Sequence, residues 1–289
     1  MRISTFQHNN WTKTELGKVQ AKTVYHQEQV ASGKKNIRMS EAPIAAGKGM
    51  AVNHSIRNLE QMQQDLSDAK EIMTTKETAL SGIQKALDRV NSLALDAANG
   101  TKSPEDRQAI ATEVDGLIQQ VVHLANTEQG GRFLFGGKDT TQPPYAADGS
   151  SQSKGEATSW QLGSSYTVKV TEDAGNVFSP MLKTLSDLSQ TLKDPAADGS
   201  SIKGLMDQNS KSMDNVLNML TETGSVMSTM QSFEDILAEQ KVGLEERRSS
   251  IEDVDVMEAV SDLSTANAAY QATLQAVSMM NKISILNYM

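Results

Sequence analysis

The chain has 289 residues, of which 38% are hydrophobic and 22% are charged, with a net charge of −9 and no cysteine. The acidic balance argues against general nucleic-acid binding and against attraction to an anionic membrane, and the absence of cysteine excludes disulfides and thiolate metal sites. There is no run of about 18 apolar residues that would span a bilayer, and the first part of the chain lacks the apolar core of a secretory signal peptide.

Residues 1–40 predict a weak amphipathic helix followed by a loop. Leu16, Val19 and Val30 can share one helix face, but Thr23 and His26 interrupt it. A helix with so short an apolar stripe is marginal without a partner. Gly, Asn and Pro in residues 32–43 indicate the loop.

Residues 52–97 predict one long helix. Apolar residues recur there at alternating steps of three and four, the period of a coiled coil, and only Lys76 breaks the set. At 1.5 Å per residue this helix would be about 70 Å long, so it needs partner helices along its side. The positions are Leu59, Met62, Leu66, Ala69, Met73, Lys76, Leu80, Ile83, Leu87, Val90, Ala94 and Ala97.

A second helix is expected to fold back on the first. Asn99-Gly100 is a helix stop, Ser103 is a good N-cap, and Pro104 suits the first helical position. Gly130-Gly131 is expected to end this second helix. The predicted core of the helical hairpin is Leu59, Leu66, Met73, Leu80, Leu87, Val90, Ile110, Val114, Leu117, Val121 and Leu124.

Residues 132–178 predict a small β-rich insertion. Pro143-Pro144 breaks any helix, and Trp160–Leu162 with the alternating Tyr166, Val168 and Val170 indicates a β-hairpin. Ser179-Pro180 is then expected to start a helix that stops before Asp194. A second long helical tract, with a patchier apolar stripe, is expected over residues 202–249.

The last segment predicts a helix whose apolar face reaches almost to the end of the chain. Asp255 is its expected N-cap, with Glu258 three residues on. Chain ends normally fray, so an apolar stripe there indicates cover from another chain. Asn267 and Asn281 either set the register of that contact or point to water. The predicted assembly interface is Leu16, Val19, Val30, Val260, Leu263, Tyr270, Leu274, Val277 and Leu286.

Motifs for chemistry are missing from the sequence. There is no GxGxxG, P-loop, HExxH or GxSxG, and the four histidines have no partners at ligand spacing. Met206, Met213, Met227 and Met230 are better explained as core filling than as an adaptable groove. The sequence therefore predicts no enzyme activity, no cofactor and no metal site.

Several motifs resemble those of the flagellin-related axial proteins of the bacterial flagellum. These are the opening Met1-Arg2-Ile3-Ser4-Thr5, the loop from Ala31 to Ile37 followed by Ala42-Pro43, and the close Ile283-Ser284-Ile285-Leu286-Asn287-Tyr288. The stretch Leu124-Ala125-Asn126-Thr127, leading to Gly131-Arg132-Phe133-Leu134-Phe135-Gly136-Gly137, resembles the junction proteins of this family rather than flagellin.

This resemblance implies a secreted structural subunit at the hook–filament junction, exported by the type III route. Its implied partners are further copies in a ring, the first hook-associated protein, flagellin and an export chaperone, with no nucleic acid and no membrane. The alternatives are flagellin itself, a type III-secreted coiled-coil effector or translocator, and an enzyme with a site in the β insertion.

The expected fold is mainly α, with long coiled-coil-like hairpins formed by the terminal regions and a small β insertion in the middle. The expected segments are an N-terminal assembly segment (1–40), a long helical hairpin (41–131), a β-rich insertion (132–178), a helical segment packing on the hairpin (179–250) and a C-terminal assembly helix (251–289).

Overall fold

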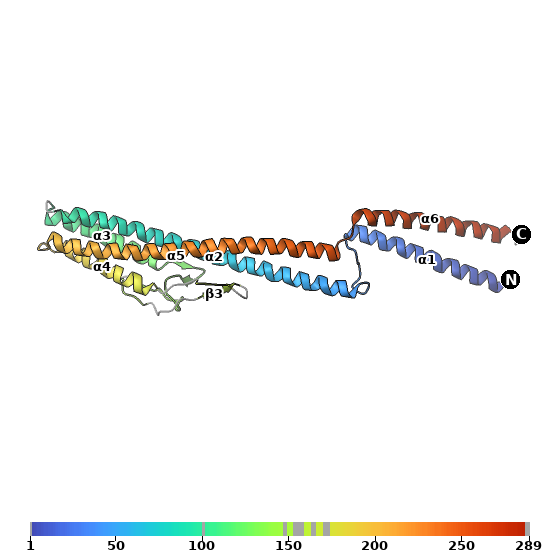
Figure 1. Cartoon of the computed structure of the whole chain (residues 1–289), viewed down its shortest axis with the longest axis horizontal. Coiled ribbons are helices and arrows are strands. Elements are labelled where there is room, and N and C mark those ends of the chain that lie inside the picture. Colours follow the sequence, from blue (N-terminus) through green and yellow to red (C-terminus); the bar gives the residue numbers. More distant parts are fainter. Residues whose placement is uncertain are drawn as a thin grey trace. The chain divides into compact units, whose positions relative to one another are not determined.

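The computed structural model describes residues 2–99, 102–146, 149–152, 159–162, 166–169 and 174–286. These residues form a mainly helical fold with two small strand pairs, so the predicted fold class is confirmed (Figure 1). The helices are α1 (Arg2–Ser32), α2 (Pro43–Ala98), α3 (Pro104–Ala125), α4 (Gly175–Lys193), α5 (Gly199–Glu252) and α6 (Val256–Leu286). The strands are β1 (Glu128–Gln129), β2 (Arg132–Phe133), β3 (Ser159–Leu162) and β4 (Tyr166–Lys169).

The chain divides into two compact units. The terminal unit combines residues 1–59 with 238–289, and the central unit is residues 60–237. Each of the long helices α2 and α5 contributes one part to each unit. The five-segment division expected from the sequence stays a prediction.

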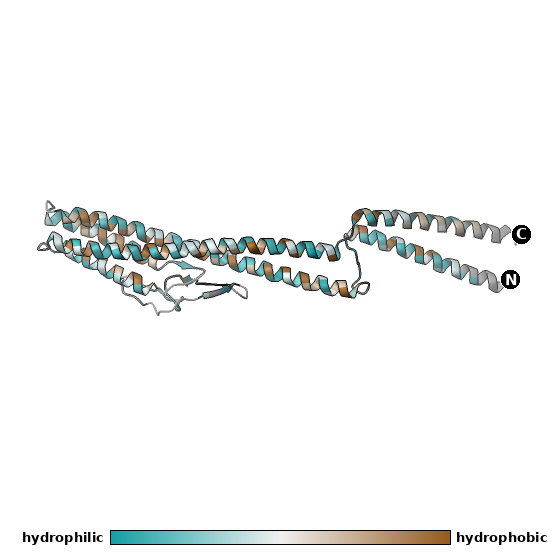
Figure 2. Cartoon of the chain, viewed as in Figure 1, coloured by the Kyte–Doolittle hydropathy of each residue, from teal (hydrophilic) through white to brown (hydrophobic). Residues whose placement is uncertain are grey.

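The central unit is a bundle in which parts of α2 and α5 lie beside α3 and α4 (Figure 1). Arg89 Nε on α2 donates to the Glu113 carboxylate on α3 at 2.7 Å. Glu234 is a charged residue that interrupts the apolar stripe of α5. Its carboxylate pairs with Lys70 Nζ on α2 at 2.9 Å. The helices are amphipathic, with apolar residues recurring between polar ones along α2 (Figure 2).

The core of the central unit follows the three–four repeat of α2. Every position of that repeat from Leu66 to Ala97, Lys76 included, is buried. On α3, Ile110, Val114 and Val121 are also buried, whereas Leu117 and Leu124 are half-buried. Asn209 is a polar exception on α5, where its amide donates to Asn91 Oδ1 at 2.8 Å.

Helix starts and stops agree with the sequence at some places and differ at others. Ser103 caps α3 with Pro104 next to it, and Ser103 and Asp106 form a reciprocal capping box, which confirms that prediction. α2 begins at Pro43, nine residues before the predicted start. The predicted stop at Gly100 lies outside the described residues.

The predicted start of α4 at Pro180 is wrong, because the helix begins at Gly175. The carbonyl of Ala174 accepts the N–H groups of Val177 and Phe178 and so forms a first turn before the proline. Phe178 is fully buried against Phe135, with ring centroids 5.1 Å apart, and this packing stabilises the earlier turn.

The predicted end of α3 at Gly130-Gly131 is also wrong. The helix ends at Ala125, and the two glycines form the turn between β1 and β2 with φ of 59° and 75°. Positive φ at both turn residues is the pattern of a tight hairpin turn and favours glycine. The predicted β-hairpin further on is confirmed, because β3 pairs antiparallel with β4, with Val170 outside the described residues.

Candidate assembly interface

The helices α1 and α6 lie side by side in the terminal unit, but few of their side chains are buried (Figure 1). α6 starts where the sequence predicts, with Asp255 Oδ1 accepting the N–H of Met257 at 2.9 Å. Among the described side chains of α1 and α6, only Gln29, Ala259 and Ala266 are buried. Two of these are alanines, so the pair closes on very little apolar volume.

The predicted interface residues are distributed over this pair. Val260 and Leu274 are exposed, at 47% and 41%. The side chain of Leu286 lies outside the described residues, and Asn267 is exposed to solvent in this chain. The half-buried members of the set are Leu16, Val19, Val30, Leu263, Tyr270 and Val277.

Further exposed apolar residues of the terminal unit were not in the predicted set. The predicted interface included only one apolar stripe per helix and so left out large apolar side chains beside that stripe. These residues have polar neighbours in the sequence and form no repeat, although their size and apolar character are visible in the sequence. They are Trp11, Val24, Met39, Ile44, Met50, Val242, Val256, Met257 and Met279.

A backbone bridge joins the two segments that connect the terminal helices to α2 and α5. The N–H of Lys35 donates to the carbonyl of Glu252 at 2.7 Å, and the N–H of Val254 donates to the carbonyl of Gly33 at 2.9 Å. Lys34 and Asp253 thereby form an antiparallel bridge. We call residues 33–35 and 252–254 the joint.

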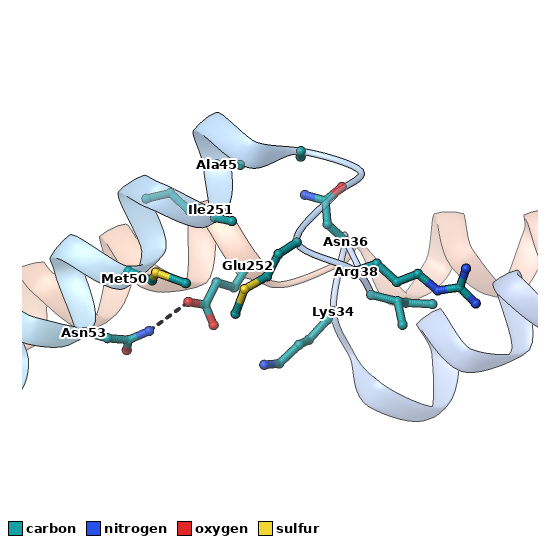
Figure 3. Close-up of a pocket in the computed structure, with 12 residues that line it drawn as sticks. Lys34, Asn36, Arg38, Ala45, Met50, Asn53, Ile251 and Glu252 are labelled. Carbon is teal, nitrogen blue, oxygen red and sulfur yellow. Dashed lines mark hydrogen bonds between the residues drawn. The ribbon is translucent and has the colours of Figure 1, made fainter.

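The Glu252 side chain fixes the joint to the start of α2. Asn53 Nδ2 donates to Glu252 Oε1 at 2.9 Å (Figure 3). A Cβ on Gly49 would come within 2.8 Å of the same carboxylate oxygen, so the glycine leaves room for this contact. Only a loop was predicted for residues 32–43, because a bridge between residues so far apart in the chain leaves no pattern in the local sequence.

Side chains of α1 hold the rest of the loop. The buried Gln29 donates from Nε2 to the carbonyl of Lys35 at 2.8 Å, and His26 Nδ1 lies 3.0 Å from Gln29 Oε1. The Tyr25 hydroxyl donates to the Glu41 carboxylate at 3.3 Å. Burial raises the pKa of Tyr25, and the nearby Glu41 charge raises it further, so this phenol stays a donor at neutral pH.

A cavity of about 230 Å³ lies beside the joint, lined in part by Met39, Ala45, Ala46, Met50 and Ile251 (Figure 3). Its wall combines these apolar side chains with charged and polar ones from Lys34, Arg38 and Glu252.

Within the described part of the chain, no three or more His, Cys, Asp or Glu side chains come together in a way that could hold a metal ion. No helix there is long and apolar enough to cross a membrane.

Comparison with known proteins gives consistent matches. Residues 3–140 match the model of the bacterial flagellin N-terminal helical region, and residues 205–289 match that of the bacterial flagellin C-terminal helical region. The chain is 25% identical over 312 aligned positions to flagellar hook-associated protein 3 of Escherichia coli (strain K12), covering 99% of this chain and 98% of that relative.

Solved structures give the same picture. The chain is 37% identical in sequence to Bacillus cereus FlgL, whose crystal structure aligns with a TM-score of 0.64. The alignment covers 69% of this chain and 99% of that chain. A putative flagellar hook-associated protein from Vibrio parahaemolyticus shares the fold, with a TM-score of 0.69 at 18% identity, over 74% of this chain and 100% of that chain.

Proposed function

Because this chain belongs to the bacterial flagellin family, as a homologue of the FlgL hook-associated proteins, we propose that its paired terminal helices form the packing surface of a hook–filament junction subunit. It is a structural component of the flagellum, and the junction function fits it better than the function of flagellin itself.

The observation that supports this mechanism is the exposure of large apolar side chains along α1 and α6. Val260 and Leu274 are more than 40% exposed and lie on α6 next to the stripe that contains the buried Ala259 and Ala266. Burying an apolar side chain of this size contributes roughly 1.5–3 kcal/mol when the burial is complete. Several such side chains on each subunit would together offset the cost of ordering the helices on assembly.

The partners follow from this surface and from the family. Copies of the chain pack laterally through α1 and α6 into a ring, with the first hook-associated protein on one side and flagellin on the other. An export chaperone covers the same apolar surface before assembly, and the subunit is exported to the outside of the cell. No catalytic step is needed, because packing alone makes the junction.

The double substitution Val260→Asp with Leu274→Asp tests the mechanism. Both residues are exposed in the single chain, so the variant should fold with an unchanged melting temperature. Two charges inside the subunit contact should nevertheless abolish incorporation into flagella, measured as flagella per cell and swimming in a strain that lacks the native gene.

Ile236→Asp is the matched control. Ile236 is 49% exposed, an exposure similar to that of Val260 and Leu274, but it lies on α5 in the central unit. The control should restore swimming like the unmodified chain. Normal incorporation of the double variant, or equal loss with the control, would show that the terminal helices are not the packing surface.

The alternative function, flagellin itself, makes a different prediction for the purified chain. A flagellin polymerises into long filaments, whereas a junction subunit stops at a short ring. Electron microscopy of the concentrated protein separates the two outcomes.

A further inference from the structure

The methionines of this chain divide sharply by exposure between the two units. Among the methionines whose side chains the structure describes, the four exposed ones all lie in the terminal unit: Met39 at 66%, Met50 at 53%, Met257 at 82% and Met279 at 62%. In the central unit, every described methionine is buried or half-buried. The fully buried set there is Met73, Met181, Met219 and Met230.

We propose that Met39, Met50, Met257 and Met279 form an oxidation site through which peroxide blocks assembly of the free subunit. This rests on the proposed function, because it assumes that the terminal unit is the packing surface. On assembly the neighbouring subunits cover the four thioethers, so the site is open only after release from the chaperone and before incorporation.

The chemistry needs one oxidant, a hydroperoxide such as hydrogen peroxide. A lone pair of the thioether sulfur attacks one peroxide oxygen, and the O–O bond breaks as the S–O bond forms. The proton of the transferred oxygen passes to the departing hydroxide, which leaves as water. The sulfur is oxidised by two electrons and the peroxide is reduced by two. Methionine sulfoxide reductases with a dithiol reverse the reaction and release the oxygen as water.

The consequence for assembly follows from polarity. A thioether is unbranched and polarizable and packs well against irregular apolar surfaces. A sulfoxide is polar and chiral and disrupts methionine-rich contacts. Met39 and Met50 both line the cavity beside the joint, while Met257 lies in the first turn of α6 and Met279 in its C-terminal third, so the oxidised positions include the joint region and α6.

Graded hydrogen peroxide on the purified full-length chain, followed by quenching and peptide mass spectrometry, tests the site. We expect sulfoxide at the four exposed methionines to form at least about tenfold faster than at the four buried ones, since oxidation follows exposure. On subunits already incorporated into flagella, oxidation of the same four should slow by about the same factor. Equal rates across the two sets, or no protection in flagella, would overturn the proposal.

Incorporation is measured by adding the treated chain to cells that lack the gene. The oxidised chain should lose at least about tenfold in flagella formed per cell, and treatment with both methionine sulfoxide reductases should restore it. In the variant with Met39→Leu, Met50→Leu, Met257→Leu and Met279→Leu, peroxide should leave incorporation at the level of the same variant without treatment, and a further loss on treatment would overturn the proposal. The variant with Met73→Leu and Met230→Leu is the control, and peroxide should lower its incorporation as much as that of the native chain.

Two failures are distinguishable. If the untreated chain does not incorporate at all, the proposed function fails. If the untreated chain incorporates and the oxidised chain does so equally well, with its helical circular dichroism unchanged, the function stands and the oxidation site is refuted.

Discussion

The central unit and the terminal unit are both built from helices, yet they differ in how far their apolar side chains are covered. In the central unit, Leu80, Leu87 and Val90 are fully buried in the bundle. In the terminal unit, only five of the described apolar side chains are buried: Val52, Ile56, Leu59, Ala259 and Ala266. Apolar side chains along the helices therefore complete a core in the central unit, whereas in the terminal unit many of them stay exposed in the single chain.

This difference separates stability from function. Substitutions in the central unit should act on the free energy of unfolding of the single chain. Substitutions at exposed apolar positions of the terminal unit should act on assembly and leave the single chain folded. The double substitution Val260→Asp with Leu274→Asp should show this separation most clearly, since it is expected to abolish assembly and to leave the stability of the single chain almost unchanged.

The largest expected effect on stability is at Leu87. Leu87→Ala removes a fully buried side chain from the bundle and should lower the free energy of unfolding by about 3 kcal/mol. Leu274→Ala, at a 41% exposed leucine of the terminal unit, should lower it by less than about 0.5 kcal/mol. Urea unfolding followed by circular dichroism measures both, and equal losses would contradict the division between the two units.

A smaller effect is expected at the helix caps. Ser103→Ala removes the capping box of α3 and should lower the free energy of unfolding of the central unit by about 1 kcal/mol. Asp255→Ala removes the cap of α6, because Asp255 Oδ1 accepts the N–H groups of Met257 and Glu258. This substitution should speed hydrogen exchange at residues 256–260 without changing the midpoint of the main unfolding transition. If both substitutions lowered that midpoint equally, the two units would unfold together.

The smallest effect is a pH dependence in the central unit at Asp115. Burial would raise the pKa of this carboxyl, but hydrogen bonds from Lys193 and Ser189 outweigh it and lower the pKa below its ordinary 3.8. A lowered pKa contributes stability above pH 3.8 that is lost as the pH falls through the folded-state value. The pair is partly exposed, so the contribution should be about 0.5 kcal/mol or less.

Lys193→Met measures that contribution. The stability difference between the native chain and the variant should be present at pH 6 and should shrink when urea unfolding is repeated near pH 3. A difference that stays constant over this range would show that the Asp115 charge does not stabilise the bundle.

The sequence predicted those parts of the fold that have a local cause. The three–four repeat of α2, the Ser103 and Asp255 caps and the β3–β4 alternation are all set by neighbouring residues, and each was found as expected. The start of α4 was missed because the packing of Phe178 on Phe135, two distant residues, overrides the usual preference of Pro180 for the first turn.

Other features could not be predicted, for the same reason. Asn209 looks like a surface residue in sequence, yet it is buried and bonded to Asn91 more than a hundred residues away. Met39 and Ile44 lie in or next to a predicted loop, and loops carry no periodicity from which exposure on a packing surface can be inferred. The candidate interface was therefore predicted as one stripe per helix, whereas the exposed apolar residues lie on more than one face.

The joint has a mechanical consequence. Residues 33–35 and 252–254 are cross-linked by two backbone hydrogen bonds, so tension applied to either terminal helix reaches both polypeptide segments at once. Neither segment can lengthen unless those two bonds shear together, and the Asn53 contact to Glu252 adds a third point of resistance. A subunit connected in this way divides a pulling force between two peptide strands, which suits a part of a cell appendage that moves.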